Sequence, residues 1–245
     1  MSDYIYGKNS VVESLKIGQG EKLYIQRQDP NRRSSFGHVI SLAKDLGLPI
    51  IELDRAKLDK MSEGGNHQGI LLLSSGFSYS SLDDLFALAE ARGEDPFFLL
   101  LDGITDPQNF GAIIRSAECV GVHGIIIPER RSVSVTSTVH KTSAGATSYM
   151  KVCQVTNLNQ TIDQLKKRNV WVYGADMKGD KSLWETDFSG SCCIVIGSEG
   201  EGMHRLTREK CDFLVSIPML GKINSLNASC SASILMYEVL RTRRI

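Results

Sequence analysis

Three segments in the second half of the chain place small and polar residues where an apolar stretch gives way to a helical pattern. They read DPQNFGAIIRSA (106–117), CCIVIGSEGEGM (192–203) and SIPMLGKINSLNASCSASILMYEVL (216–240). In open α/β sheets, ligands bind at the carboxyl ends of the strands, where such loops gather. The three segments therefore predict one composite ligand site, built mainly from backbone groups.

The common nucleotide-binding fingerprints are absent from the sequence. There is no G-x-x-x-x-G-K-[ST] phosphate loop, and no G-x-G-x-x-G turn joins the first strand and helix of either half. The nearest match, Gly197-Ser-Glu-Gly200-Glu-Gly202, has a different order of spacings and occurs late in the chain. These absences argue against a Rossmann dehydrogenase, a kinase and an ordinary Rossmann-type methyltransferase.

Composition narrows the class of protein. With 245 residues, 42% of them hydrophobic, the chain can bury a sizeable core in one or two domains. A formal net charge of +0 argues mildly against nucleic-acid binding by bulk charge, although local arginine clusters keep such binding open. The cysteines and histidines show no metal-type spacing, so we expect no metal site. With no signal-peptide pattern and no run near the ~20 apolar residues of a membrane helix, we expect a cytoplasmic protein without a membrane partner.

The elements that must position the site fall into two blocks joined by a connection. Residues 1–74 are predicted to fold as a small α/β sandwich that holds the substrate. Its expected elements are helices at 9–15 and 34–46, the second capped by Ser34 or Ser35, and strands at 22–26, 48–53 and 69–74. Residues 75–96 are predicted to be a linker with a short amphipathic helix at 82–91.

From Phe97 onward, near-continuous apolar runs alternate with helical patterns. This alternation predicts a parallel sheet that is buried on both faces and wrapped by helices. The expected strands are 97–103, 123–129, 150–155, 170–176, 192–198 and 213–218, and the expected helices are 111–120, 158–168, 203–210 and 228–240.

The motifs of this second block resemble the SpoU class of the SPOUT methyltransferases, RNA ribose 2′-O-methyltransferases that use S-adenosylmethionine. The resemblance rests on Asn109-Phe-Gly111-Ala-Ile-Ile-Arg115-Ser-Ala117, on Ile196-Gly197-Ser-Glu199-Gly200, and on Ile217-Pro218 with Ser225-Leu226-Asn227-Ala-Ser229. Three motifs in the correct order are far more specific than any one of them. The first block opens with IYGKNSVVESL and closes with HQGILL, and it resembles the substrate-binding domain of the bacterial large-subunit rRNA guanosine 2′-O-methyltransferases.

This resemblance implies a fold and an assembly that composition does not reveal. Residues 97–245 would form a catalytic α/β domain whose C-terminal segment makes a deep trefoil knot, a topology essentially absent from ordinary folds. Residues 1–74 would form a ribosomal-protein-like domain that binds the RNA. The resemblance further implies S-adenosylmethionine as the cofactor, and a homodimer with the active site at or near the subunit interface.

Arg115 matches the catalytic arginine of the family. A guanidinium stays protonated in proteins, so we expect Arg115 to hold an RNA phosphate and to stabilise charge developing on the 2′ oxygen, rather than to act as a free base. Help from that phosphate as the proton acceptor stays open. Without the surrounding motif, Arg115 would be interpreted as half of a salt bridge on a helix surface.

The other matched polar residues have a structural interpretation beside the catalytic one. Asn109 is expected to cap a helix, to order the active site, or both. Glu199 is expected to cap the next helix or, as the favoured interpretation, to form an ion pair with Arg115. Asn227 and Ser229 are expected to cap the last helix or to lie in the knot loop, with Ser229 close to the reacting ribose.

Four further residues match the cofactor-contact positions of the family, and they are Ile196, Gly197, Ile217 and Leu226. Because their side chains are apolar or missing, recognition of adenine and ribose is expected to come largely from backbone groups.

For function, the resemblance implies 2′-O-methylation of a guanosine in the peptidyl-transferase region of 23S rRNA. Two alternatives stay open. One is a tRNA ribose 2′-O-methyltransferase, because the motifs specify the chemistry better than the substrate. The other is a catalytically silent RNA-binding factor of ribosome assembly that kept the fold.

Overall fold

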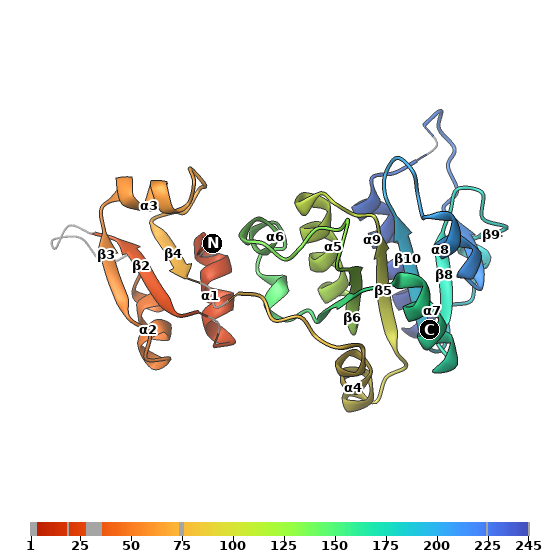
Figure 1. Ribbon diagram of the computed structural model, residues 1–245, viewed down its shortest axis with the longest axis horizontal. Helices are drawn as coiled ribbons and strands as arrows, with labels where there is room; N and C mark the ends of the chain where they lie inside the picture. Colours follow the sequence, from red (N-terminus) through yellow and green to blue (C-terminus); the bar gives the residue numbers. More distant parts are fainter. Residues whose placement is uncertain (1–3, 19, 28–35, 74–75, 224, 245) are drawn as a thin grey trace. The chain divides into compact units, whose positions relative to one another are not determined.

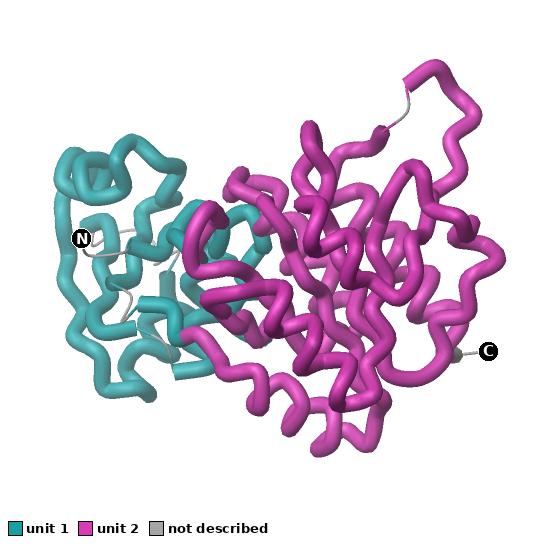
Figure 2. Tube along the Cα trace, turned by 45° about the vertical axis from the view of Figure 1, so that its right-hand side comes forward, with its two compact units in different colours: residues 1–78, 135–149 teal, residues 79–134, 150–245 magenta. Residues whose placement is uncertain are grey.

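The computed structural model describes residues 4–18, 20–27, 36–73, 76–223 and 225–244. Contacts divide the chain into two compact units (Figure 2). The first unit consists of residues 1–78 and 135–149, and the second of residues 79–134 and 150–245.

The first unit contains a four-stranded sheet in the order β1-β4-β2-β3, in which β2 and β3 are parallel and β4 is antiparallel to β1 and β2 (Figure 1). Its elements before residue 79 are β1 (Tyr4–Tyr6), α1 (Lys8–Lys16), β2 (Lys22–Gln26), α2 (Gly37–Asp45), β3 (Ile50–Leu53), α3 (Arg55–Met61) and β4 (Ile70–Leu73). Leu23 and Ile25 alternate along β2 and are buried in one cluster with Val11 and Leu15, which are four residues apart on α1. Helix α1 and strand β2 confirm the helix expected at 9–15 and the strand expected at 22–26.

The second part of the first unit follows β6 (Gly124–Pro128) in the sequence. It consists of α6 (Ser137–Thr142) and the 3-10 helix η1 (Ala146–Ser148). His140 of α6 is buried, with its Nε2 2.9 Å from the Ser14 hydroxyl of α1 and its Nδ1 hydrogen-bonded to the Thr147 hydroxyl. Burial lowers the pKa of His140 below its ordinary value. These bonds explain why 135–149 groups with residues 1–78, a grouping that differs from the expected boundaries.

The second unit contains a seven-stranded, wholly parallel sheet in the order β7-β6-β5-β10-β8-β11-β9. Its elements are α4 (Leu82–Arg92), β5 (Phe97–Asp102), α5 (Pro107–Cys119), β6 (Gly124–Pro128), β7 (Val152–Val155), α7 (Leu158–Lys167), β8 (Trp171–Ala175), β9 (Lys181–Ser182), the 3-10 helix η2 (Leu183–Glu185), β10 (Cys192–Gly197), α8 (Arg205–Lys210), β11 (Phe213–Ser216) and α9 (Ala228–Arg244). All six residues of β5 are buried, as the apolar run predicted.

Helices cover both faces of this sheet. On one face, Leu85 of α4 and Ile162 of α7 share an apolar cluster with alternate residues of β5 and β10, such as Phe98 and Val195. On the other face, α5 packs against α9, and α9 contacts β10 (Figure 1). The predicted parallel sheet wrapped by helices is confirmed.

The segment expected to be a linker, 75–96, contains α4. A capping box starts this helix, with the Ser81 hydroxyl accepting from Asp84 N and the Asp84 carboxylate accepting from Ser81 N. Leu85 and Ala89 are fully buried, so α4 is part of the second unit. The helix expected at 82–91 is present, but its packing differs from that of a linker.

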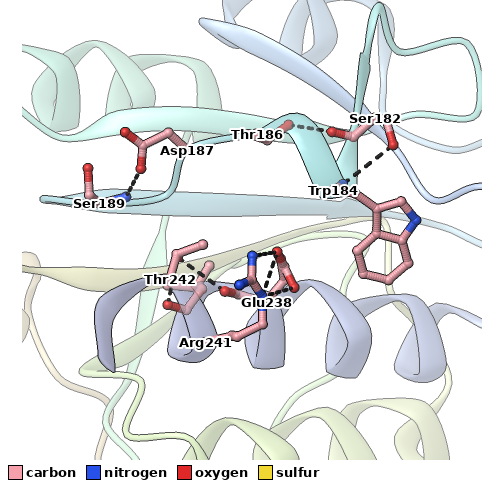
Figure 3. A network of polar contacts seen from close by, with 9 residues as sticks. Ser182, Trp184, Thr186, Asp187, Ser189, Glu238, Arg241 and Thr242 are labelled. Carbon is pink, nitrogen blue, oxygen red and sulfur yellow. Dashed lines mark hydrogen bonds and ion pairs between the residues drawn. The ribbon is translucent and has the colours of Figure 1, made fainter. Parts of the chain in front are cut away.

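The C-terminal half of α9 is fixed by polar contacts. The buried Glu238 carboxylate accepts three hydrogen bonds from Arg241, including one of 2.6 Å from Nη2 (Figure 3). Arg243 donates to the carbonyls of Asp95, at 2.9 Å, and Pro96, at 3.0 Å, just before β5. The Glu238–Arg241 bonds lie within the helix, whereas the Arg243 bonds tie the C-terminal end of α9 to the segment just before β5.

Candidate active site

A tight turn at residues 198–202 follows β10. Ser198 and Gly202 exchange two backbone hydrogen bonds of 3.0 Å, and Gly202 has a φ of +70°, which favours glycine. A Cβ on Gly197 would lie 2.1 Å from the Gly202 carbonyl carbon and 2.2 Å from Met203 N. Gly197 therefore allows the turn to fold back against the strand end, with Glu199 presented inside the turn.

Glu199 is the centre of a hydrogen-bond network that joins all three predicted motifs. Its Oε1 accepts from Asn109 Nδ2 at 2.8 Å, from Asn227 Nδ2 at 2.5 Å and from Ala228 N at 3.3 Å. Asn227 Nδ2 also donates to Asn109 Oδ1 at 2.8 Å. The structure thus brings together Asn109, Glu199 and Asn227, which we call the amide–carboxylate network.

Asn227 caps α9, which is one of the two roles that the sequence suggested. Its Oδ1 accepts from Ser229 N at 2.9 Å and Cys230 N at 3.3 Å, which is the bonding of a helix N-cap. The Ser229 hydroxyl also donates to that oxygen, at 2.5 Å. One end of the amide therefore starts α9 while the other end joins Glu199.

Two structural expectations for these residues are wrong. Asn109 does not cap α5, because Asp106 does: its carboxylate accepts from Gln108 N and Asn109 N, each at 3.1 Å, and Pro107 occupies the first helical position. Helix α5 consequently begins four residues earlier than its apolar pattern indicated. The sequence pair Asp-Pro is the signal that could have located this start.

The second wrong expectation is the ion pair between Glu199 and Arg115. Arg115 lies six residues after Asn109 on α5, which is about 9 Å along the axis and on a different side of the helix. Its side chain is exposed and has no hydrogen bond or ion pair with any other described residue. Neither the pairing with Glu199 nor an ordinary surface salt bridge accounts for Arg115.

A cavity of about 530 Å³ opens at the carboxyl ends of β8, β10 and β11. Its volume is typical of small-molecule sites. The four residues predicted to contact a cofactor, Ile196, Gly197, Ile217 and Leu226, all line this cavity. Glu199 lines it as well, so the amide–carboxylate network borders the cavity.

Among the charged side chains that line the cavity, some have an ion-pair partner among the described residues and others do not. Asp176 forms an ion pair with Arg208, whose Nε lies 2.5 Å from Oδ2, and accepts from Lys178 N at 2.7 Å. Burial works to raise the pKa of Asp176, but these hydrogen bonds outweigh it and hold the pKa below its ordinary value. Asp176 directly follows β8. Because ligands bind at the carboxyl ends of the strands, its position could have identified it as a candidate site residue, as it did for Glu199. The carboxylates of Glu199 and Glu201 add negative charge to the same lining.

In the part of the chain that the structure describes, no group of three or more histidine, cysteine, aspartate or glutamate side chains is arranged to hold a metal ion. No described helix is both long enough and apolar enough to span a membrane.

Comparison with protein families matches both halves of the chain. The model of the SpoU rRNA Methylase family matches residues 96–237. The model described as RNA 2′-O ribose methyltransferase substrate binding matches residues 4–80.

Individual proteins are similar to this chain over nearly its whole length. The putative TrmH family tRNA/rRNA methyltransferase YacO of Bacillus subtilis (strain 168) is 46% identical over 98% of this chain and 96% of its own length. Among solved structures, the SpoU methyltransferase AviRb from Streptomyces viridochromogenes has a TM-score of 0.83 and 23% identity, over 99% of this chain and 90% of that chain. AviRb in complex with the cofactor AdoMet has a TM-score of 0.79 and 23% identity, over 97% of this chain and 89% of that chain. The matched family model and the nearly full-length relative show that this chain belongs to the SpoU rRNA methylase family.

Proposed function

We propose that this protein transfers the methyl group of S-adenosylmethionine to a ribose 2′-hydroxyl of RNA, and that its target is a guanosine in the peptidyl-transferase region of 23S rRNA. The observation that carries the proposal is the cavity bordered by the amide–carboxylate network, because it joins the three family motifs at one edge of the sheet. The RNA substrate makes the cytoplasm the compartment in which we expect the protein to act.

The residues around the cavity fit S-adenosylmethionine. Ile196, Ile217 and Leu226 offer an apolar surface for an adenine ring, and Gly197 leaves the backbone open to polar groups of the ligand. The Glu199 and Glu201 carboxylates favour a positively charged ligand such as a sulfonium. When bound, S-adenosylmethionine supplies an activated methyl group, so the work of the protein is to orient the hydroxyl and manage its proton.

Arg115 supports a homodimeric active site. Its exposed guanidinium has no partner among the described residues and does not line the cavity of its own chain. We infer that Arg115 of one protomer reaches the cavity of its partner, where it binds an RNA phosphate and stabilises negative charge on the 2′ oxygen.

The substrate has a second candidate. The Bacillus relative is named a tRNA/rRNA methyltransferase, so a tRNA ribose is the alternative target. A silent assembly factor is less well supported, because Asn109, Glu199 and Asn227 are present and form their network.

The test is transfer of a labelled methyl group to unmethylated 23S rRNA and to tRNA in parallel, with the product mapped by alkaline hydrolysis, which a 2′-O-methyl group blocks. One resistant guanosine in the peptidyl-transferase region supports the proposal. Label in tRNA alone moves the assignment to the second candidate. Absence of transfer to either RNA contradicts the enzymatic function.

A further inference from the structure

Two exposed arginines follow β6 at the carboxyl edge of the parallel sheet. Arg130 and Arg131 belong to the loop 129–133, whose sequence is ERRSV. In the sheet, β6 pairs with β5 and β5 pairs with β10. The strand that leads into this loop therefore lies two strand spacings, about 10 Å, from the strand that leads to Glu199.

Both ends of this loop are hydrogen-bonded to neighbouring strand ends. At its start, Glu129 N donates at 3.0 Å to the carbonyl of Val155, the last residue of β7. At its end, Val133 is 7% exposed, and its N–H donates at 3.0 Å to the carbonyl of Ile104, which lies two residues after β5. The loop is thus tied to the β5–α5 connection, which leads to Asn109 and the amide–carboxylate network.

Arg131 has its backbone in the left-handed region, with a φ of +59°. Glycine adopts this conformation without steric cost, whereas a residue with a Cβ is strained there. Strained residues of this kind persist where the surrounding structure imposes the conformation, and they cluster at functional sites. The backbone of this loop alone would favour glycine at position 131, so the presence of arginine is better explained by its side chain.

The guanidinium groups of Arg130 and Arg131 have no partner within the described residues. Neither group forms a hydrogen bond or an ion pair there, and this includes the adjacent Glu129. Most other arginine side chains described in the second unit bind a carboxylate or main-chain carbonyls, and these are Arg168, Arg205, Arg208, Arg241 and Arg243. Arg130 and Arg131 are therefore two adjacent cations that are available to a negatively charged ligand.

The negatively charged ligand that approaches this edge of the sheet in the proposed function is RNA. A ribose held beside the amide–carboxylate network has a phosphate on each side, and the strand continues from there over the protein surface. Guanidinium groups bind phosphate oxygens through two parallel hydrogen bonds. Such contacts position a nucleic acid without reading its sequence.

We propose that Arg130 and Arg131 bind phosphate groups of the RNA strand beside the reacting nucleotide, an inference that rests on the proposed function. The hydrogen bonds at both ends of the loop hold the two guanidinium groups at the edge of the sheet that carries the network. Neither arginine lines the cavity, so their role concerns binding of RNA and not binding of the cofactor.

Three variants separate the charge of the loop from its backbone strain. The double variant Arg130→Gln with Arg131→Gln removes both charges and keeps long side chains, whereas Arg131→Gly removes one charge together with the strain. The matched control is Arg92→Gln, which changes an exposed arginine at the end of α4, in the segment that leads to the amino end of β5.

RNA binding would be measured by fluorescence anisotropy over a series of salt concentrations. The probes are a labelled, unmethylated fragment of the peptidyl-transferase region of 23S rRNA and a labelled tRNA. Calorimetric affinity for S-adenosylmethionine, the urea midpoint of unfolding and methyl transfer would be measured on the same proteins.

We expect the double variant to bind RNA about 10-fold more weakly than the wild-type protein, with unchanged affinity for S-adenosylmethionine. The slope of log affinity against log salt concentration should become shallower by about 1.4, since each phosphate contact to a single strand contributes about 0.7. Arg131→Gly should show about half of this change in slope, while its urea midpoint stays the same or rises, because glycine suits the conformation. Arg92→Gln should bind RNA as the wild-type protein does.

An RNA affinity of the double variant within threefold of wild type overturns the proposal. So does a weaker affinity with an unchanged salt slope, because partial unfolding predicts that result, and so does an equal loss of affinity in Arg92→Gln. A wild-type protein that binds these RNAs but methylates neither contradicts the proposed function, and the salt slopes still decide the role of the arginines. A wild-type protein that binds neither RNA contradicts both.

Discussion

At the residue scale, Asn227 serves two purposes with the two ends of one amide. Oδ1 caps α9, and Nδ2 bonds Glu199 and Asn109. The two purposes are separable, because serine keeps an N-cap acceptor but has no amide donor that reaches across to Glu199.

We predict that Asn227→Ala lowers the free energy of unfolding by about 1 kcal/mol and removes methyl transfer. Asn227→Ser should keep most of the stability and still lose transfer. Urea denaturation and the transfer assay measure the two effects. If Asn227→Ser remains fully active, the network has no catalytic importance.

Arg115 gives a second prediction of this kind. Because its side chain is exposed and unpartnered within the described residues, Arg115→Ala should change the free energy of unfolding by less than about 0.5 kcal/mol. Transfer should be abolished while calorimetric affinity for S-adenosylmethionine is kept. Arg115→Lys should also be impaired, since lysine lacks the bidentate geometry. Normal activity of Arg115→Ala would contradict the assigned role.

The sequence predicted that polar residues of the three motifs lie together better than it predicted how they pair. Glu199 and Asn227 were expected near each other because both follow strands of one sheet. In the structure, Asn227 Nδ2 lies 2.5 Å from Glu199 Oε1. The pairing of Glu199 with Arg115 was wrong because a motif read along a line hides the 100° turn per residue of a helix. The hydrogen bond between Asp102 Oδ1 and His204 Nδ1, which are 2.7 Å apart, was not predicted. The two residues are 102 positions apart and belong to no shared motif.

At the element scale, apolar runs located the strands of the parallel sheet well, and short or polar elements were missed. Three-residue β1 and two-residue β9 are too short to show a period. Helix α6 has the sequence STVHKT and buries a histidine. It therefore has no apolar stripe from which a helix could be predicted. Helix α4 was expected, but only the structure reveals that its apolar face is buried in the second unit.

The attachment of α6 predicts a pH dependence of stability. Burial lowers the pKa of His140, and it also lowers that of His123 in the second unit. The unfolded chain then binds more protons than the folded chain below about pH 6.5, so the free energy of unfolding falls as pH drops through that value. Urea denaturation between pH 7.5 and 5.5 should reveal this decline, and His140→Gln should reduce its slope. A free energy of unfolding that stays constant or rises as the pH drops from 7.5 to 5.5 would contradict the buried neutral state of His140.

At the scale of the whole molecule, the proposed sharing of Arg115 between protomers makes the site a property of the dimer. The trefoil knot belongs to the same scale, and it is implied by the fold of the family. Neither can be read from hydrophobic patterns, because both depend on how a chain threads or pairs after its elements have formed.

Mixing two inactive variants tests the sharing. Arg115→Ala keeps an intact cavity, and Gly197→Ala keeps an intact arginine. If Arg115 acts in the cavity of its partner, an equal mixture that exchanges subunits should recover about a quarter of wild-type transfer, since half the dimers are mixed and each has one complete site. No recovery, with subunit exchange verified by native mass spectrometry, would mean that Arg115 acts within its own chain.

The most direct test of the central claim, that the cavity at the ends of β8, β10 and β11 binds S-adenosylmethionine, is a calorimetric titration of the wild-type protein and of Gly197→Ala. A Cβ at position 197 would lie 2.1 Å from the Gly202 carbonyl carbon, so the 198–202 turn must move and take Glu199 with it. We predict one cofactor bound per wild-type chain and none bound by Gly197→Ala that is folded by circular dichroism. No binding by the wild-type protein, or equal affinity in the variant, would contradict this account.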